Sequence, residues 1–318
     1  MPVHAFLFPG QGSQTVGMGR ELAAAFPAAR EIFQEVDETL KQKLSRLMFE
    51  GSPADLTLTE NAQPALMAVS IAVLRVIEAE GGTRLADRAA VVAGHSLGEY
   101  SALAAAGAFT LGKAARLLRL RGQAMQKAVP AGEGAMAALL GADLDEAAAI
   151  CAEAAEGPDG RQVVQIANDN GGGQVVISGD RAAVERALEI ARERGVRRAM
   201  LLAVSAPFHC ALMAPAAEVM AAALETAAIK PPDVPVIANV SAGKATEPAA
   251  IRDLLVRQVT ETVRWRESVL AMAALGVDSF VELGAGKVLS GLVKRIAPDA
   301  ATAAAGTASE IEALLKLL

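Results

Sequence analysis

Short apolar runs separated by helical stretches dominate the first and last thirds of the chain. They lie at residues 3–8, 89–93, 234–240 and 279–283. Apolar runs of this length are typical of strands that are buried on both faces of a parallel sheet. Pro9-Gly10 closes the first run, and the second leads through Gly94 into a helix-forming stretch. This succession of strand, tight turn and helix predicts an α/β core with a mostly parallel sheet.

The middle of the chain follows a different pattern, with four predicted strands and two predicted helices. The strands lie at residues 135–140, 162–167, 174–178 and 198–204. We expect one helix to begin after Asp143 and the other after Asp180, because aspartate is a preferred N-cap residue. The resulting order β-α-β-β-α-β is that of the ferredoxin-like unit. We predict that residues 132–206 form this unit as an insertion, and that 1–131 and 207–318 form a larger α/β domain.

The sequence Gly94-x-Ser96-x-Gly98 matches the nucleophile-elbow pattern, with a predicted strand before it and a predicted helix after it. Small flanking residues let the helix pack closely against the strand, which exposes the serine hydroxyl. This geometry also directs the backbone N–H of Leu97 at the oxygen of an attacked carbonyl. The motif therefore predicts that Ser96 is a nucleophile, although the same spacing also occurs by chance in glycine-rich chains.

A serine hydroxyl needs a base to act as a nucleophile, and the chain has only three histidines. His95 adjoins Ser96, so its side chain points away from the hydroxyl, and His4 lies in a predicted buried strand. By elimination the base is His209, in a loop after the predicted insertion. The alternative is an ordinary hydrogen-bonded loop histidine.

Arg121 interrupts the apolar stripe of a predicted helix that begins after Thr110. The stripe at i, i+3 and i+4 spacing consists of Ala114, Leu117, Leu118, Arg121 and Met125. A buried guanidinium needs an anionic partner, and its planar fork suits a carboxylate. Arg121 therefore indicates either a structural salt bridge to a protein carboxylate or a substrate acyl group that ends in a carboxylate.

Composition narrows the class of protein. Hydrophobic residues are 53% and charged residues 21% of the 318, as in globular proteins. Aromatic residues are 3% and the net charge is −6, so neither base stacking nor phosphate-backbone binding is expected, and we predict no nucleic-acid partner.

We further expect a cytoplasmic protein that does not associate with membranes. No apolar run approaches the ~18 residues of a membrane span, and Arg20 is the first basic residue, so no signal peptide is predicted. The two cysteines, Cys151 and Cys210, are too few for a disulfide framework or a four-thiolate metal site.

An ordered set of short motifs along nearly the whole chain resembles the malonyl-CoA:acyl carrier protein transacylase family of type II fatty acid synthesis. In the one-letter code the motifs are FPGQGSQ from Phe8, QPA from Gln63, GHSLGEY from Gly94, RG from Arg121, QVVISG from Gln174, PFH from Pro207, VRW from Val263 and ELGAGKVL from Glu282. The chain departs from the family pattern at Gly172 and Thr262, where the family often has proline.

The resemblance implies an α/β-hydrolase-like large domain and a ping-pong transfer from malonyl-CoA to acyl carrier protein, without a metal or redox cofactor. It implies that Ser96 is the nucleophile, His209 the base and Arg121 the residue that holds the malonyl carboxylate. The oxyanion hole is expected from the backbone N–H groups of Gln11 and Leu97. We also expect a monomer.

The resemblance implies further substrate-binding residues at Gln258, Met125 and Phe208, with a main-chain carbonyl near Gln258 orienting the histidine. The bulk of Phe208 is expected to disfavour an α-methyl group, although one methyl is worth only ~1–3 kcal/mol in a pocket.

Three other functions stay open: a serine hydrolase or thioesterase, a polyketide-type acyltransferase, and a non-catalytic scaffold with the same fold. An acidic carrier protein would need a local basic patch on this acidic chain. Two segments offer one: Arg192, Arg194, Arg197 and Arg198, or Lys287, Lys294 and Arg295.

Overall fold

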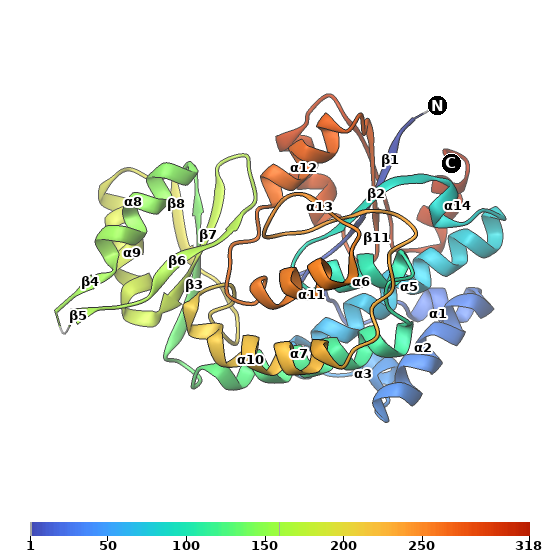
Figure 1. The fold of residues 1–318 in the computed structure, drawn as a ribbon, viewed down its shortest axis with the longest axis horizontal. Coiled ribbons are helices and arrows are strands. Elements are labelled where there is room, and N and C mark those ends of the chain that lie inside the picture. Colours follow the sequence, from blue (N-terminus) through green and yellow to red (C-terminus); the bar gives the residue numbers. More distant parts are fainter. Residues whose placement is uncertain (1, 159) are drawn as a thin grey trace.

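A computed structural model describes residues 2–158 and 160–318, and it separates into a larger and a smaller unit (Figure 1). A six-stranded sheet in the order β10-β9-β2-β1-β11-β12 forms the centre of the larger unit. The strands are β1 (His4–Phe8), β2 (Ala89–Gly94), β9 (Val236–Ile237), β10 (Lys244–Ala245), β11 (Ser279–Leu283) and β12 (Ala301–Ala305). All neighbouring strands are parallel except β9 and β10. The predicted α/β core with a mostly parallel sheet is confirmed.

Helices bury both faces of this sheet, and the side-chain alternation of β1 shows how. Phe6 and Phe8 belong to one apolar cluster and Ala5 and Leu7 to another, because successive strand residues point to opposite faces. The first cluster includes α2 (Pro27–Leu40), α5 (Thr59–Gly81), α6 (Gly98–Ala105), α7 (Leu111–Ala128), α10 (Ala214–Glu225) and α14 (Ala308–Leu315). The second includes α12 (Trp265–Ala274) and α13 (Val288–Ile296). The first cluster also contains residues of α1 (Arg20–Ala25), α3 (Leu44–Glu50), α4 (Pro53–Thr57), α11 (Pro248–Arg257) and the short 3₁₀ turns at Leu85–Asp87 and Ala211–Met213.

The smaller unit is an antiparallel sheet in the order β6-β7-β3-β8 with two helices. Along the chain its main elements are β3 (Gly134–Leu140), α8 (Leu144–Ala154), β6 (Val164–Asp169), β7 (Gln174–Asp180), α9 (Arg181–Glu193) and β8 (Arg198–Leu201), with a small β4–β5 ribbon at Glu156–Gly157 and Gly160–Arg161. Asp143 caps α8 by accepting a hydrogen bond from the Glu146 N–H at 2.8 Å. Asp180 precedes α9, but its carboxylate accepts from the Val163 N–H instead.

The longest helix, α5, was not predicted to be so apolar. Its most apolar 18-residue window has a mean hydropathy of 1.5, so by length and composition alone it could cross a membrane. However, 83% of that window is buried inside the protein, where the helix packs against α2 and α7. A helix that is hydrophobic on most sides is also what the centre of a large core requires.

The strand predictions differ from the structure most clearly at two places. The run 234–240 forms a strand only at Val236–Ile237, because Asn239 leaves the sheet and hydrogen-bonds around the serine turn. Strand β12 was not predicted, because its sequence of four alanines and one threonine carries no β-branched or aromatic run. The short strands β4, β5 and β10 were also not predicted, β6 lies two residues later than the predicted 162–167, and the predicted strand 198–204 ends at Leu201.

Candidate active site

Ser96 lies on a strained turn between β2 and α6. Its backbone φ is 53°, in the left-handed region that non-glycine residues rarely adopt. The turn is possible because its flanking glycines are crowded: a Cβ on Gly94 would lie 1.9 Å from the Gly98 carbonyl oxygen, and one on Gly98 would lie 2.2 Å from the Phe8 carbonyl oxygen. The spacing Gly-x-Ser-x-Gly is therefore a steric requirement of this strand–turn–helix junction.

His209 lies within hydrogen-bond distance of the Ser96 hydroxyl. Its Nε2 is 2.8 Å from Ser96 Oγ, and its Nδ1 is 2.8 Å from the main-chain oxygen of Gln258. Because a carbonyl oxygen only accepts, Nδ1 carries the proton and the lone pair of Nε2 faces the hydroxyl. A main-chain carbonyl thus takes the orienting position that a carboxylate occupies in many triads.

Burial and a neighbouring cation keep His209 neutral. Desolvation, followed by the positive charge of Arg121, lowers the pKa of His209 to about 3. The imidazole is therefore a free base throughout the physiological range, ready to accept a proton from the serine.

Arg121 is 1% exposed and points from α7 at the serine. Its Nη2 donates to Ser96 Oγ at 3.2 Å and to Gln258 Oε1 at 2.9 Å, while Nη1 donates to Gln63 Oε1 at 2.9 Å. The ring of Tyr100 lies 5.7 Å from the guanidinium carbon. Within the described part of the chain, the guanidinium has no ion-pair partner, so the structural salt bridge that the sequence left open is absent there.

Sequence reasoning missed a buried polar network behind these residues, formed by Gln63, Glu99 and Asn239. Asn239 Oδ1 accepts from the Ser96 N–H at 2.8 Å, and Glu99 Oε2 accepts from the Asn239 N–H at 2.9 Å. Gln63 and Glu99 were inside quoted motifs without a role. Their signal in the sequence is a polar residue within an apolar helix, which is costly unless it is hydrogen-bonded.

A cavity of about 360 Å³ opens over Ser96 and is lined by residues of both units. Of the predicted site residues, Gln11, Leu97, Met125 and Phe208 line it together with Ser96, Arg121 and His209. The N–H groups of Gln11 and Leu97 have no main-chain acceptor among the described residues. Gln258 is different: it is fully buried behind Arg121 and is not part of the cavity wall.

The cavity also contains a hydrogen bond between the two units. His95 Nε2 lies 2.9 Å from Asn170 Oδ1 directly after β6, and both residues line the cavity.

Among residues 2–158 and 160–318, no three His, Cys, Asp or Glu side chains are grouped in a way that could hold a metal ion.

An α/β fold that carries a serine on an elbow and a neutral histidine at its hydroxyl defines the class of serine acyl-transfer proteins. Comparison with protein families agrees, because residues 5–304 match the family described as acyl transferase domain. The chain belongs to this acyl transferase family.

Relatives are similar along their whole length. The malonyl CoA-acyl carrier protein transacylase of Bacillus subtilis is 50% identical over 99% of this chain and 96% of its own. That of Escherichia coli strain K12 is 47% identical over all of both chains. The solved acyl-carrier-protein-S-malonyltransferase from Bartonella henselae is 56% identical, covers 99% of each chain and has a TM-score of 0.95. A malonyl-transacylase solved in complex with its type II PKS acyl-carrier protein is 42% identical, covers 99% of this chain and 100% of its own, and also has a TM-score of 0.95.

Proposed function

We propose that this protein transfers the malonyl group of malonyl-CoA to the phosphopantetheine thiol of acyl carrier protein, which supplies malonyl-carrier protein for fatty acid synthesis. The observation that carries the proposal is the guanidinium of Arg121, which is buried 3.2 Å from the nucleophile with only uncharged partners. A cation in that position needs an anion, and the carboxylate of a malonyl group bound at Ser96 supplies one. The names of the relatives support this substrate.

The transfer proceeds in two half-reactions through a malonyl-serine ester. Ser96 Oγ attacks the thioester carbonyl while His209 Nε2 takes its proton, and the oxyanion is stabilised by the N–H groups of Gln11 and Leu97. The carbon–sulfur bond then breaks, and the coenzyme A thiolate leaves with the proton from His209. The carrier-protein thiol next gives its proton to His209 and attacks the ester carbonyl. The bond between the acyl carbon and Ser96 Oγ then breaks, and His209 returns the proton to Ser96 Oγ, which releases malonyl-carrier protein and restores the hydroxyl. The chemistry requires no metal or redox cofactor.

The walls of the cavity are proposed to select the acyl group. Met125 and Phe208 are apolar residues that line it beside Arg121, so they restrict the space at the α-carbon. Gln258 contributes indirectly, because its side chain holds Arg121 and its main-chain oxygen holds His209.

The finer architecture and location are part of the same proposal. We assign residues 132–206 to a ferredoxin-like insertion, which the order of β3, α8, β6, β7, α9 and β8 supports. Residues 1–131 and 207–318 then form an α/β-hydrolase-like domain. We also propose that the protein is a cytoplasmic monomer that does not associate with membranes. The two cysteines are free and buried, which agrees with a reducing compartment such as the cytoplasm.

Intact-mass measurement after mixing with malonyl-CoA tests the nucleophile. We expect the mass of the wild type to increase by one malonyl group, and the Ser96→Ala variant to show no increase, because that substitution removes the hydroxyl 2.8 Å from His209. A malonyl adduct that persists on Ser96→Ala would disprove the assignment.

Labelled malonyl-CoA separates transfer from hydrolysis. If acyl carrier protein receives the label, the protein is a transferase, whereas release of free malonate in the presence of carrier protein would make it a thioesterase. The same assay can compare the rate of transfer to carrier proteins of fatty acid synthesis with the rate to those of polyketide synthesis. The comparison is of interest because one relative was solved with a type II PKS acyl-carrier protein, and the faster acceptor identifies the pathway.

A further inference from the structure

Glu99 is a buried acid beside the site, and the proposed transfer gives it no part. It lies in the first turn of α6, three residues after Ser96, and is 3% exposed. A carboxylate is costly to bury unless hydrogen bonds compensate for its lost hydration. Its hydrogen-bond partners therefore indicate what it does.

The first partner connects Glu99 to both the cation and the base. Glu99 Oε2 accepts from Gln258 Nε2 at 2.7 Å, while Gln258 Oε1 accepts from Arg121 Nη2 at 2.9 Å. The main-chain oxygen of the same glutamine accepts from His209 Nδ1 at 2.8 Å. Whatever fixes Gln258 thus fixes Arg121 and His209 together.

The charges on either side determine which way the Gln258 amide faces. A carboxylate only accepts hydrogen bonds and a guanidinium only donates them. The NH₂ group of Gln258 must therefore face Glu99 and its oxygen must face Arg121. A neutral amide at position 99 lacks the charge that strengthens the bond to this NH₂ group. Gln258 Nε2 would then be held mainly by the Ser96 carbonyl oxygen at 3.0 Å and Asn239 Oδ1 at 3.3 Å, so Gln258 would be fixed less firmly.

The second partner connects Glu99 to the serine turn. Glu99 Oε2 accepts from the Asn239 N–H at 2.9 Å. The side chain of Asn239 in turn accepts from the Ser96 N–H and donates to the Gly94 carbonyl oxygen, both at 2.8 Å. These contacts hold the backbone of the elbow at the point where Ser96 is strained.

We infer that Glu99 is a positioning residue of this site: through Gln258 and Asn239, its carboxylate orients Arg121, His209 and the Ser96 elbow together. The inference rests on the proposed malonyl transfer and adds a residue that touches neither the substrate nor the reacting atoms. Its effect should depend on whether the carboxyl group is ionised.

The surroundings of Glu99 place that ionisation where it can be measured. The elements packed against α6 are β1, β2, α5, α7 and β9. Arg121 of α7 is the charged group that acts on the carboxylate, and the adjacent Tyr100 phenol is neutral. Desolvation, partly offset by these hydrogen bonds and by Arg121, raises the pKa of Glu99 to about 7. Positioning therefore weakens as the pH falls through about 7, whereas His209, with a pKa of about 3, stays neutral there.

The test is single-turnover formation of malonyl-Ser96 between about pH 5.5 and pH 8.5, together with acetyl-CoA as a second donor. We expect the wild-type rate to decline on the acid side with a midpoint near pH 7. Glu99→Gln should be roughly tenfold slower at pH 8, because neutral hydrogen bonds replace charged ones, and should lack the acid decline. Its preference for malonyl over acetyl should also shrink, since Gln258, which accepts from Arg121, is held less firmly.

Glu282→Gln is the matched control. Glu282 is equally buried, and its carboxylate holds the Leu289 and Ser290 N–H groups at the start of α13 rather than the serine turn. We expect this variant to keep the acid decline even if it is less stable. A Glu99→Gln variant with the wild-type rate and decline would overturn the inference, whereas no malonyl adduct on the wild type would overturn the proposed function. If Glu99→Gln fails to fold, the wild-type profile decides, because a flat rate across pH 7 also overturns the inference.

Discussion

Arg121 is positively charged, and the residues that contact it directly are neutral. Gln63, Gln258 and Ser96 are its hydrogen-bond partners, and Glu99 is connected to it only through Gln258. Desolvation lowers the pKa of Arg121, but the guanidinium stays charged because its ordinary value is so high. The charge of Arg121 is therefore incompletely compensated by the described residues, and the proposed malonyl carboxylate would be its anionic partner.

Arg121→Ala should change acyl preference rather than abolish acylation uniformly. Without the guanidinium, a malonyl carboxylate is buried unpaired, which costs about 3–5 kcal/mol. Acetyl carries no such charge and should be accepted relatively better. Loading rates from malonyl-CoA and acetyl-CoA measure the effect, with Arg116→Ala as the control because Arg116 is exposed on the same helix. Equal losses for both donors would mean that Arg121 is only structural.

The site residues that the sequence pointed to are those that stand out from the residues around them or are rare in the chain. Ser96 was marked by its glycines, His209 by elimination among three histidines, and Arg121 by its place in an apolar stripe. Glu99 stands out only as a polar residue within an apolar helix, and Asn239 has no such signal, because the roles of both depend on which distant groups they contact. That information is tertiary: Asn239 and Ser96 are 143 positions apart.

At the scale of elements, β1 and α6 lie so close together that only a glycine fits between them at position 98. Gly98→Ala would place a methyl group 2.2 Å from the Phe8 carbonyl oxygen, so α6 must move away from the sheet and take Ser96 with it. We expect a fall in both the denaturation midpoint and the rate of serine acylation. Gly291→Ala is the control, since its added methyl meets nothing within 4 Å in helix α13 and should stabilise by roughly 0.5–1 kcal/mol. A Gly98→Ala variant as stable and active as the wild type would contradict this account.

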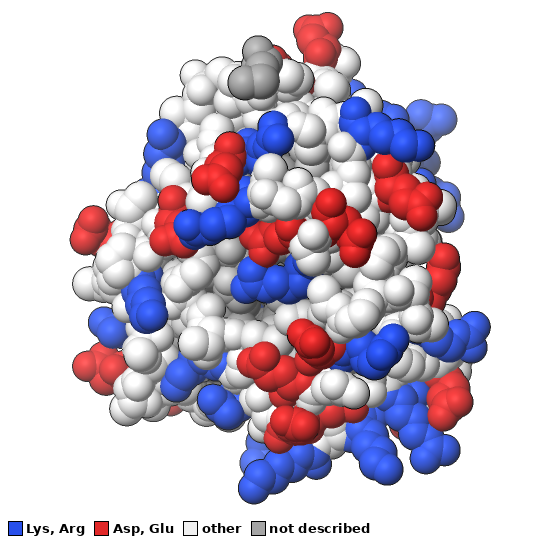
Figure 2. Space-filling model, turned by 90° about the vertical axis from the view of Figure 1, so that its right-hand side faces the viewer, with Lys and Arg blue, Asp and Glu red and all other residues white. Residues whose placement is uncertain are grey.

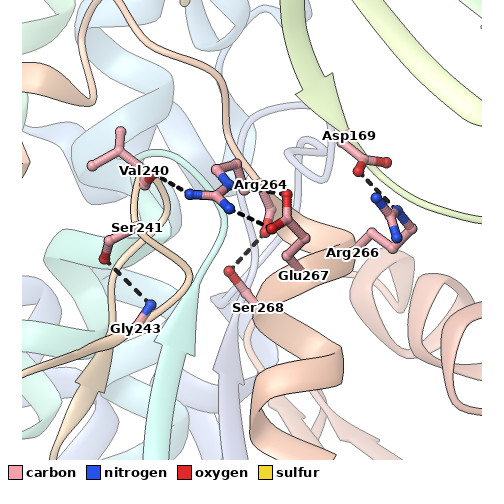
Figure 3. Close-up of polar contacts among 8 residues, drawn as sticks. All are labelled: Asp169, Val240, Ser241, Gly243, Arg264, Arg266, Glu267 and Ser268. Atoms are coloured by element: carbon pink, nitrogen blue, oxygen red, sulfur yellow. Dashed lines mark hydrogen bonds and ion pairs between the residues drawn. The ribbon is translucent and has the colours of Figure 1, made fainter. Parts of the chain in front are cut away.

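A second element contact fixes the small unit to the large one. Asp169 at the end of β6 is 3% exposed, and its carboxylate accepts from Arg266 Nε of α12 at 2.8 Å. Figure 3 shows Arg266 turned toward Asp169 while the neighbouring Arg264 reaches Glu267 and the Val240 carbonyl oxygen. Main-chain hydrogen bonds of Val263 with Ala167 and Asp169, and the Thr262 hydroxyl on the Ile166 oxygen, strengthen the same junction. The side-chain hydroxyl of Thr262 is a hydrogen-bond donor that proline, the residue common in the family at this position, does not have.

Arg266→Ala should lower the free energy of unfolding by about 1–3 kcal/mol, because it leaves a buried carboxylate short of a partner. Arg257→Ala is the matched control: its pairs with Asp253 and Glu261 are exposed, so its loss should cost at most ~1 kcal/mol. Chemical denaturation measures both. An Arg266→Ala variant no less stable than Arg257→Ala would remove this ion pair as a junction between the units.

The elements that the sequence predicted well are those with strong local signals. Strand β11 has the predicted bounds, and the main elements of the middle unit follow the predicted order, with the small β4–β5 ribbon added between α8 and β6. Strand β12 was missed because its alanine-rich sequence has a low intrinsic preference for strand. It forms a strand through parallel pairing with β11, which the sequence does not show. The extent of α5 was not predicted either. A helix that is apolar on most sides does not show the periodic alternation of apolar and polar positions by which an amphipathic helix is recognised.

At the scale of the whole molecule, the distribution of surface charge bears on how a carrier protein would dock. Figure 2 shows one face on which basic and acidic side chains alternate. Two of the cations in the predicted docking segments are also paired, Arg194 with Glu153 at 2.5 Å and Lys287 with Glu310 at 2.7 Å. Lys294 is exposed on α13, the helix whose Leu289 and Leu292 line the cavity. It is therefore the better candidate for contact with an acidic carrier protein.

Lys294→Glu should raise the KM for carrier protein and leave the KM for malonyl-CoA nearly unchanged. The wild-type KM for carrier protein should also rise with salt, because exposed charges are screened over ~8–10 Å at moderate ionic strength. Lys43→Glu, a charge reversal at an exposed position before α3, is the control. A KM for carrier protein that neither salt nor Lys294→Glu alters would exclude electrostatic docking at α13.

The position of β1 in the middle of the sheet has a consequence for how the protein is made. β1 pairs with β11, and the His4 ring meets the Ser279 hydroxyl at 2.9 Å across 275 positions of sequence. At about 5–20 residues per second, the ribosome needs roughly 14 to 55 s to produce that partner after β1. During that interval one edge of an apolar strand is unpaired, so nascent chains should bind chaperones strongly until β11 emerges. The central sheet, and with it the packing around the elbow, can therefore be completed only after β11 has been synthesised.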